Sequence, residues 1–180
     1  MDHPACALAS DDILPHVHRV APGLIRVDAD EVTYPLHVIL RYELEQLLVD
    51  GKLEVTDLPE AWDAKMRDYL GLSTIDNPAD GPMQDVHWPG GAFGYFPSYT
   101  LGAMMAAQQW AAFEQTHPDA NGDIARGDSQ RVENWRRSNI WSQGSRWSTP
   151  ALLERATGEK LNADHFIGHL KRRYGQLGQP

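Results

Sequence analysis

The sequence contains a single cysteine, Cys6, among its 180 residues. One thiol cannot close a disulfide within the chain, and it cannot build a zinc site made of several cysteines. Only an intermolecular disulfide or a free thiol remains for Cys6. Folds stapled by internal disulfides are therefore excluded.

Long hydrophobic runs and clusters of basic residues are also missing. No stretch approaches 18 consecutive apolar residues, and the start lacks the basic and apolar regions of a secretory signal peptide. We therefore expect a cytoplasmic protein. The 16 lysines and arginines are outnumbered by 25 aspartates and glutamates, which gives a formal net charge of −9. Because phosphates and anionic lipids require clustered positive charge, this composition argues against nucleic-acid and membrane partners.

The remaining composition is that of a globular domain, with 42% hydrophobic and 23% charged residues. A chain of this length can bury roughly 70% of its unfolded surface. The length predicts a single domain over residues 1–180.

Apolar residues recur mostly at helical spacing, between stops made by glycine and proline. A first, weaker segment begins at Ser10 and contains Pro15. Short strands are suggested only at residues 24–27 and 53–55. The sequence predicts an all-α fold of about six helices with at most a minor β hairpin. The six clearer helices span residues 32–49, 57–70, 97–114, 129–141, 149–158 and 162–174, with N-caps expected at Ser10, Thr149 and Asn162.

Two of these segments differ from ordinary surface structure. Residues 71–97 form one long loop rich in glycine and proline, and a structured loop of this length is usually functional. The helix over residues 97–114 is apolar nearly all round, which predicts a place in a core. If part of the protein's core partner is missing, this helix would leave an apolar patch uncovered.

The helix over residues 32–49 carries a carboxylate, Glu43, in the middle of a predicted apolar face. Burial there would raise its pKa and suit a general acid or base, unless an arginine of a neighbouring helix pairs with it. The structural ion pair is the favoured alternative. The apolar positions of this face are Leu36, Ile39, Leu40, Leu44 and Leu47.

Two pairs of polar side chains are candidates for binding. His37 and Arg41 lie one turn apart at the margin of that face, where both donors could reach one cleft or form a half-exposed edge. Tyr95 and Tyr99 flank the start of the next long helix, where hydroxyls could donate to an oxyanion or a substrate carboxylate. The alternative for the tyrosines is packing of the loop onto the core.

A metal site is suggested only by His165 and His169, which stand four residues apart on a predicted helix. Phe166 occupies the position where a zinc protease keeps its general-base glutamate, and no third ligand is marked by the sequence. A solvated helix face is the favoured interpretation. No metal site is predicted in this chain.

Two long motifs carry a resemblance to a known family. IRVDADEVTYPLHVILRYELE, residues 25–45, resembles an IRxxAD motif and its following helix, and MQDVHWPGGAFGYFPSYTLG, residues 83–102, resembles a GYFPTYxLG motif and its preceding loop. The tail, with LLERATGEKLN and KRRYGQL, also fits. The chain thus resembles the C-terminal part of the carboxypeptidase Taq family, zinc metallocarboxypeptidases of mostly helical fold.

The family's metal-binding portion has no counterpart in these residues. Its HExxH helix, downstream zinc-ligating glutamate, HPF and DxRxT motifs precede IRxxAD, and the sequence contains none of them. Zinc is therefore implied for the full-length family, and no cofactor is expected in this chain. His165 and His169 lie in the tail and do not replace the zinc histidines.

The resemblance does carry over substrate handling. It places Arg26 and Asp30 in the IRxxAD motif, where an arginine is expected to help hold the peptide's terminal carboxylate. It places Tyr95 and Tyr99 along the active-site cleft, with Tyr95 as possible oxyanion support. It also favours a substrate-binding role for His37 and Arg41. Two departures are mild: Ser98 replaces the family's Thr, and Pro35, where Asn is common, sets the helix start near Tyr34.

Two classes of function follow. The first is a C-terminal fragment or truncated homologue of a zinc carboxypeptidase, inactive alone, that binds peptide C-termini and needs the N-terminal part. The second is a non-catalytic peptide-binding or dimerisation module, with a homodimer covering exposed apolar surface. A separate metalloenzyme based on His165 and His169 is a third, weaker alternative.

Overall fold

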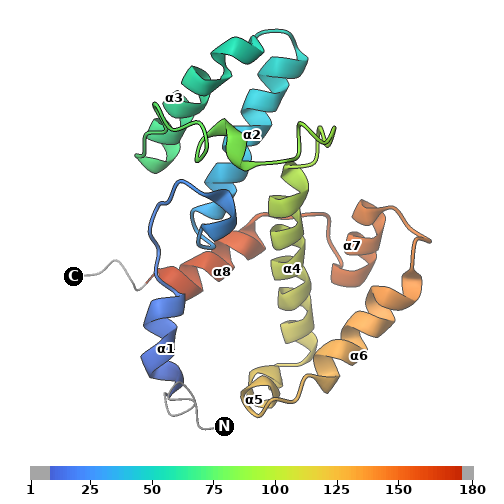
Figure 1. Cartoon of the computed structure of the whole chain (residues 1–180). Helices are drawn as coiled ribbons and strands as arrows, with labels where there is room; N and C mark the ends of the chain where they lie inside the picture. Colours follow the sequence, from blue (N-terminus) through green and yellow to red (C-terminus); the bar gives the residue numbers. More distant parts are fainter. Residues whose placement is uncertain (1–8, 176–180) are drawn as a thin grey trace. The chain divides into compact units, whose positions relative to one another are not determined.

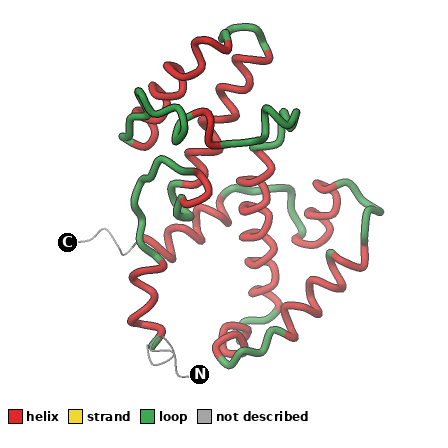
Figure 2. The backbone as a smooth tube through the Cα atoms, viewed as in Figure 1, coloured by secondary structure: helices red, strands yellow, loops and turns green. Residues whose placement is uncertain are grey.

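The computed structural model describes residues 9–175, so Cys6 lies outside the described residues. Figures 1 and 2 show a helical chain with long connections and no strand in its described part. The all-α prediction is confirmed. The helices are α1 (Ser10–Val17), α2 (Tyr34–Val49), α3 (Leu58–Leu70), α4 (Pro97–Thr116), α5 (Ala120–Ala125), α6 (Gln130–Asn139), α7 (Thr149–Thr157) and α8 (Asp164–Tyr174).

Both suggested strands are wrong. The first overlaps a 3-10 turn, Arg26–Asp28, in which the Asp28 N–H donates to the Ile25 carbonyl. In the second, the N–H of Leu53 donates to the carbonyl of Leu47, so the segment closes the end of α2. Neither segment has a neighbouring strand to pair with, and a strand without a partner leaves its backbone groups unsatisfied. The short α5 was not predicted.

Glycine and proline set the helix ends where the sequence indicates. Pro35 lies in the first turn of α2, and α3 ends at Gly71, whose φ of 69° places it in the left-handed region. The predicted N-caps are wrong by one residue in three helices, since Ala9, Ser148 and Ala163 take those positions. Asn162 still accepts the backbone N–H of Asp164 through its side chain, at 2.9 Å.

The chain divides into two compact units, Met1–Thr100 and Leu101–Pro180. The prediction of a single domain stays a prediction. In the first unit α2 and α3 lie side by side (Figure 1) and form the core. Burying each large apolar side chain there contributes about 2 kcal/mol. The core residues are Leu40, Leu44, Trp62, Met66 and Leu70.

The second unit is organised by a buried amide, Gln108 of α4. Its Nε2 donates to Thr157 Oγ1 at 2.9 Å and to the carbonyls of Glu159 and Lys160, and its Oε1 accepts the N–H of Asn162 at 3.0 Å. These bonds hold α4 against the connection between α7 and α8. A polar side chain therefore joins α4 to its neighbours, although the sequence pattern predicts only apolar packing for α4.

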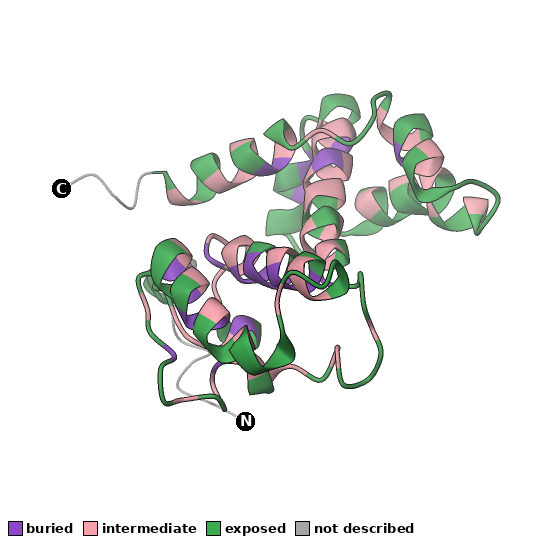
Figure 3. Ribbon diagram, turned by 90° about the horizontal axis from the view of Figure 1, so that it is seen from above, coloured by how far each residue is buried: buried purple, intermediate pink, exposed green. Residues whose placement is uncertain are grey.

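The expected burial of α4 on all sides is not found. Gln108 and Phe113 alone are buried in this helix, and Leu101 is exposed. Figure 3 shows buried positions mainly on helices and at a few places in the connections, whose other residues are exposed or intermediate. The described part of the chain thus leaves apolar surface of α4 open. No helix in residues 9–175 is long and apolar enough to span a membrane.

Candidate substrate-binding site

Two arginines of the first unit share one carboxylate. Arg26 donates to Asp85 Oδ1 through Nε at 3.1 Å and Nη2 at 2.9 Å, and Arg41 donates to Asp85 Oδ2 through Nε at 2.5 Å. Arg26 Nη1 also donates to the hydroxyl of Tyr34 at 2.8 Å. We call Arg26, Arg41 and Asp85 the arginine cluster. With two positive charges and one negative charge, it carries net positive charge in a nearly buried place.

Burial and pairing shift the pKa values within the arginine cluster. Burial alone would raise the pKa of Asp85, but Arg41 and Arg26 outweigh it and lower that pKa. Burial lowers the pKa of Arg41 to about 10, even though Asp85 opposes the change. All three groups are therefore charged near neutral pH. Arg41 Nη2 is buried without a hydrogen-bond partner.

Local structure fixes the arginine cluster from both ends. Asp30 accepts the backbone N–H groups of Val32 and Thr33, each at 2.9 Å, and thereby turns the chain from the segment of Arg26 into α2. Burial would raise the pKa of Asp30, but these hydrogen bonds and one from Ala21 lower it. Gln84 accepts the Arg26 N–H at 2.8 Å, which places Asp85 beside the guanidinium. Asp30 of the motif is thus structural here.

Aromatic rings surround the two guanidinium groups. The Arg26 guanidinium lies 5.0 Å from the ring centroid of Tyr99, and that of Arg41 lies 4.5 Å from Trp62. Phe96 lies near both, at 5.7 and 5.5 Å. Aromatic faces attract cations and exclude water, so they strengthen the charges of the arginine cluster.

His37 and Arg41 are wholly buried, which corrects their predicted place at a helix margin. Neither ring nitrogen of His37 makes a well-formed hydrogen bond, although the backbone of Gly23 slightly favours the protonated ring. Burial and the charge of Arg41 lower the pKa of His37 to about 4. The ring is therefore neutral at pH 7, and it does not reach solvent.

This neutral histidine predicts a measurable pH dependence of stability. Because the pKa of His37 falls from 6.5 to about 4 on folding, the unfolded state binds more protons between these values. The free energy of unfolding should decrease as pH falls from 6.5 to 4. In His37→Leu this part of the dependence should disappear, as measured by urea unfolding across that range. His16→Leu, at an exposed position, serves as control, and equal slopes in both variants would contradict the assignment.

The aromatic residues at the end of the long loop differ in how far they are buried. Phe96 is buried, as the packing alternative expects, whereas Tyr95 is 49% exposed. The hydroxyl of Tyr99 lies 2.9 Å from His87 Nε2, and the rings of Tyr95 and Tyr99 meet edge to face at 5.3 Å between centroids. Tyr95 and Tyr99 therefore lie together beside the arginine cluster, and the Tyr95 side chain is open to solvent.

A second carboxylate of α2 fastens the glycine-rich loop. Glu45 accepts the indole N–H of Trp88 at 2.8 Å, and it also accepts the backbone N–H of Gly94. Gly94 has a φ of 73°, a conformation that favours glycine. Glu45 thus fixes the backbone next to Tyr95.

For Glu43 the structural alternative, an ion pair with a neighbouring helix, is found, but the predicted burial and the arginine partner are wrong. Its side chain is more than a third exposed, and its partners are Lys65 Nζ and the hydroxyl of Tyr69, each at 2.5 Å, and not an arginine. These bonds lower the pKa of Glu43, where a general acid would need it raised. The buried face of α2 instead includes His37, Arg41 and Glu45. Ile39, expected on the buried side, is exposed.

The described residues do not form a metal site. No group of three or more histidine, cysteine, aspartate or glutamate side chains suitable for a metal ion occurs between residues 9 and 175. His165 is paired through Nε2 with Glu159 Oε1 at 2.5 Å. The metal of a metallopeptidase would thus not fit any ligand set seen in these residues.

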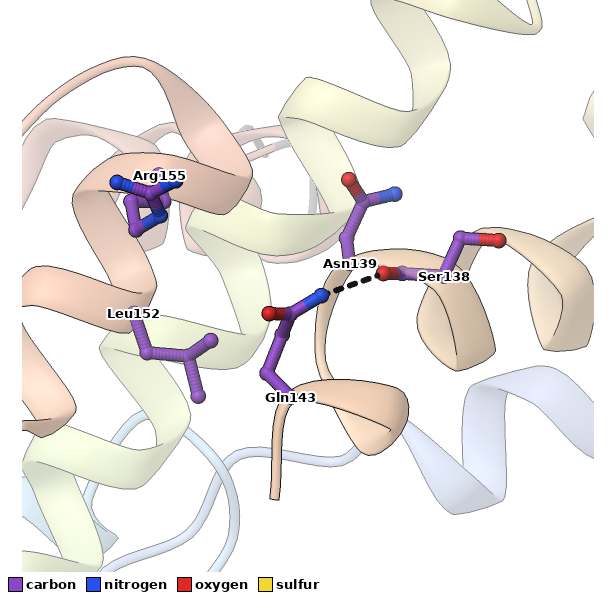
Figure 4. A pocket seen from close by; sticks show the side chains of 5 residues that line it. All are labelled: Ser138, Asn139, Gln143, Leu152 and Arg155. Carbon is purple, nitrogen blue, oxygen red and sulfur yellow. Dashed lines mark hydrogen bonds between the residues drawn. The ribbon is translucent and has the colours of Figure 1, made fainter. Parts of the chain in front are cut away.

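A polar cavity of about 410 Å³ lies in the second unit between α6 and α7 (Figure 4). Its amides are engaged internally: Gln143 Nε2 donates to the Ser138 carbonyl at 3.2 Å, and Asn139 Nδ2 donates to the Trp135 carbonyl at 2.9 Å. The Arg155 guanidinium stacks 4.2 Å from the Trp147 ring centroid. With both amides bonded to backbone carbonyls and Arg155 stacked on Trp147, we assign no binding role to this cavity.

Comparison with known proteins gives the family of this chain. The family model described as "Carboxypeptidase Taq (M32) metallopeptidase" matches residues 4–174. The arrangement of helices and both motif segments agree with that match. The chain belongs to the carboxypeptidase Taq (M32) metallopeptidase family, as the resemblance predicts.

Individual relatives are similar over nearly the whole chain. Thermostable carboxypeptidase 1 of Thermus thermophilus is 48% identical over 161 residues, which are 89% of this chain and 31% of the relative. Carboxypeptidase 1 of Bacillus subtilis is 40% identical over 94% of this chain and 34% of the relative. The solved Trypanosoma cruzi metallocarboxypeptidase 1 has a TM-score of 0.91 and 46% identity, covering 97% of this chain and 36% of that chain. The chain spans about a third of the length of the relatives it matches.

Sequence reasoning missed the acidic residues that organise the site. The sequence analysis assigned no role to the acidic Asp85 and Glu45, and none to the neighbouring His87. A search for an acidic partner to two arginines would have marked Asp85, because it is a carboxylate within the glycine- and proline-rich loop. Nothing in the sequence pattern indicates that Glu45 turns inward.

Proposed function

We propose that this chain is the substrate-binding C-terminal portion of a zinc carboxypeptidase, and that it has no hydrolytic activity alone. The observation that carries the proposal is the arginine cluster with its net positive charge, next to Tyr95 and Tyr99, in a segment that belongs to a metallopeptidase family. A peptide's terminal carboxylate is attracted by such a charge. The zinc would be held by residues outside this chain.

The side chains have different parts in this proposal. Tyr95 and Tyr99 would donate hydroxyl hydrogen bonds to the terminal carboxylate, with Tyr95 the more accessible of the two. Arg26 would act mainly through its charge, because Asp85 and Tyr34 already occupy its fork. Arg41 would add charge through its buried guanidinium, and His37 would pack beside it as a neutral ring.

A binding experiment on the isolated chain tests this proposal. Acetyl-alanyl-leucine is titrated into ¹⁵N-labelled protein, with the same peptide as its C-terminal amide for comparison. The free carboxylate should bind about tenfold more tightly, a difference of about 1.4 kcal/mol. Tyr95→Phe, which removes one hydroxyl, should weaken binding by about 3- to 10-fold. Equal binding of the amide, or no binding at millimolar peptide, would contradict the proposal.

Zinc analysis and amino-acid release test the statement about activity. With zinc added, the chain alone should contain no stoichiometric metal and should release no leucine from the same peptide. Stoichiometric zinc together with release would place the catalytic ligands within these residues. The notion of a substrate-binding portion without its own metal would then be wrong.

The partner and location are parts of the same proposal. We propose that the partner is the remaining N-terminal part of an M32 polypeptide, with a homodimer as the competing arrangement. The uncovered apolar surface of α4 supports a partner of either kind. The single cysteine and the acidic composition support a cytoplasmic location.

A further inference from the structure

An apolar groove of about 680 Å³ lies in the first unit, apart from the arginine cluster. It is formed by the end of α2, the connection from α2 to α3, the start of α3 and two parts of the long loop. Most of its lining side chains are aliphatic, aromatic or proline, and Glu54 is the charged one. We call it the Trp88 groove, after the indole in its wall.

The side chains along this groove are unusually open for apolar residues. Val55 and Met83 are each 74% exposed, Val49 is 69% exposed and Phe93 is 56% exposed. Single exposed apolar side chains are common, but four of them around one concave surface mark an interaction site. The volume is that of a site that takes several side chains.

The chemistry of the groove favours a polypeptide over a small polar ligand. Small-molecule sites combine apolar walls with a few converging polar groups, and the lining here supplies little besides the Glu54 carboxylate. The indole N–H of Trp88 is already donated to Glu45 at 2.8 Å. What the groove offers is apolar area, which suits the side chains of a packed protein segment.

We propose that the Trp88 groove is the docking surface for the N-terminal part of an M32 polypeptide. This proposal rests on the function proposed above. The structural match to the Trypanosoma cruzi enzyme covers 97% of this chain but only 36% of that enzyme, with a TM-score of 0.91. This third of the fold therefore keeps its shape, while nearly two thirds of such a protein lies outside it. We therefore take that remaining portion of an M32 protein as the partner that would cover the open apolar groove.

The groove is also connected to the candidate site. Trp88 and Gly94 are both held by Glu45, and Gly94 directly precedes Tyr95. Phe93, on the groove, adjoins Gly94 in the chain. A segment packed against Trp88 and Phe93 would fix the backbone that carries Tyr95. Docking would thus complete the substrate-binding surface as well as cover apolar area.

Co-production tests the docking surface without requiring either part to fold alone. The tagged 180-residue chain is expressed with the part of Bacillus subtilis carboxypeptidase 1 that precedes its matched region, and the complex is purified. A 1:1 complex is expected. Val55→Asp or Met83→Asp should reduce its recovery at least tenfold, while Ile75→Asp, exposed but outside the groove, should not. The melting temperatures of the three variants alone verify that they fold.

Several outcomes would overturn the proposal. These are no complex with the wild-type chain, a complex equally sensitive to Ile75→Asp, or a homodimer of this chain that Val55→Asp abolishes. Leucine release by the complex separates the two proposals. If the complex forms only with an intact groove but does not bind peptide, the proposed function alone is contradicted. If leucine release by the complex is unaffected by Met83→Asp, the docking surface alone is contradicted.

A chimera gives a second measurement if the N-terminal part is insoluble by itself. This chain, with Cys6→Ser, replaces the matched third of the Bacillus subtilis protein, and maleimide labelling of Val55→Cys is followed by mass spectrometry. Labelling should be at least tenfold slower in the chimera than in the isolated chain. Ile75→Cys should react equally in both, and equal labelling of Val55→Cys would overturn the proposal.

Discussion

Replacing Asp85 by alanine is expected to lower the free energy of unfolding by about 3–5 kcal/mol. Asp85 is the shared partner of Arg26 and Arg41, whose side chains are 7% and 0% exposed. Its removal would leave two guanidinium groups in a nearly dry place without a counter-charge. Asp85→Asn keeps the shape and removes only the charge, so it should lower the free energy of unfolding by most of the same amount. Urea unfolding followed by circular dichroism measures both variants.

The matched control for Asp85 is an ion pair at the surface. Asp50 pairs with Lys52 at 2.8 Å, and both side chains are more than half exposed. Asp50→Asn should change stability by less than about 0.5 kcal/mol, because water screens such pairs. If Asp85→Asn behaved like Asp50→Asn, the arginine cluster would not be a stabilising feature of the unit.

The effect of Asp85 should also depend on pH in a defined direction. The pKa of Asp85 is lowered in the folded state, so its stabilisation is fully present above the unfolded value of about 3.9. It is lost as pH falls through the lower folded value. The difference between wild type and Asp85→Ala should therefore shrink in acid below about pH 4. A difference that grew with acid would contradict this assignment.

The second large effect is expected at Gln108 in the other unit. Gln108→Leu has a similar volume but makes none of the four hydrogen bonds of the amide. The carbonyls of Glu159 and Lys160 and the N–H of Asn162 would each lose a partner. These groups are only partly buried, and the Glu159 carbonyl keeps the Thr157 hydroxyl as a donor at 3.2 Å, so we expect a total loss of about 2–4 kcal/mol.

Hydrogen exchange offers a local measurement of this effect. The amide of Asn162 should exchange much faster in Gln108→Leu, since its acceptor is gone. The neighbouring Gln109→Leu is the control, because Gln109 is only partly buried, and it should leave Asn162 protected. Unchanged protection in Gln108→Leu would show that this amide does not hold α4 to the α7–α8 connection.

The sequence by itself determined the local structure and the family. Proline in first turns and glycine at helix ends act through the backbone of their own segment, so Pro35 and Gly71 predicted the limits of α2 and α3 correctly. The motifs at residues 25–45 and 83–102 identified the family for the same reason, because each is a continuous run. The N-caps were wrong by one residue, because helix ends fray and their first residue is not sharply set by the local sequence.

Only the tertiary structure decided which polar side chains face inward. Helical periodicity shows which residues share a face of α2, but it does not show what covers that face. The loop brings Asp85 to Arg41 across 44 positions of sequence, and it brings Trp88 and Gly94 to Glu45. Those contacts bury Arg41 and Glu45 beside the apolar Leu40 and Leu44 of α2 and leave Glu43 to pair with Lys65 near solvent. Because burial depends on partners distant in the chain, no local pattern of α2 could have settled it.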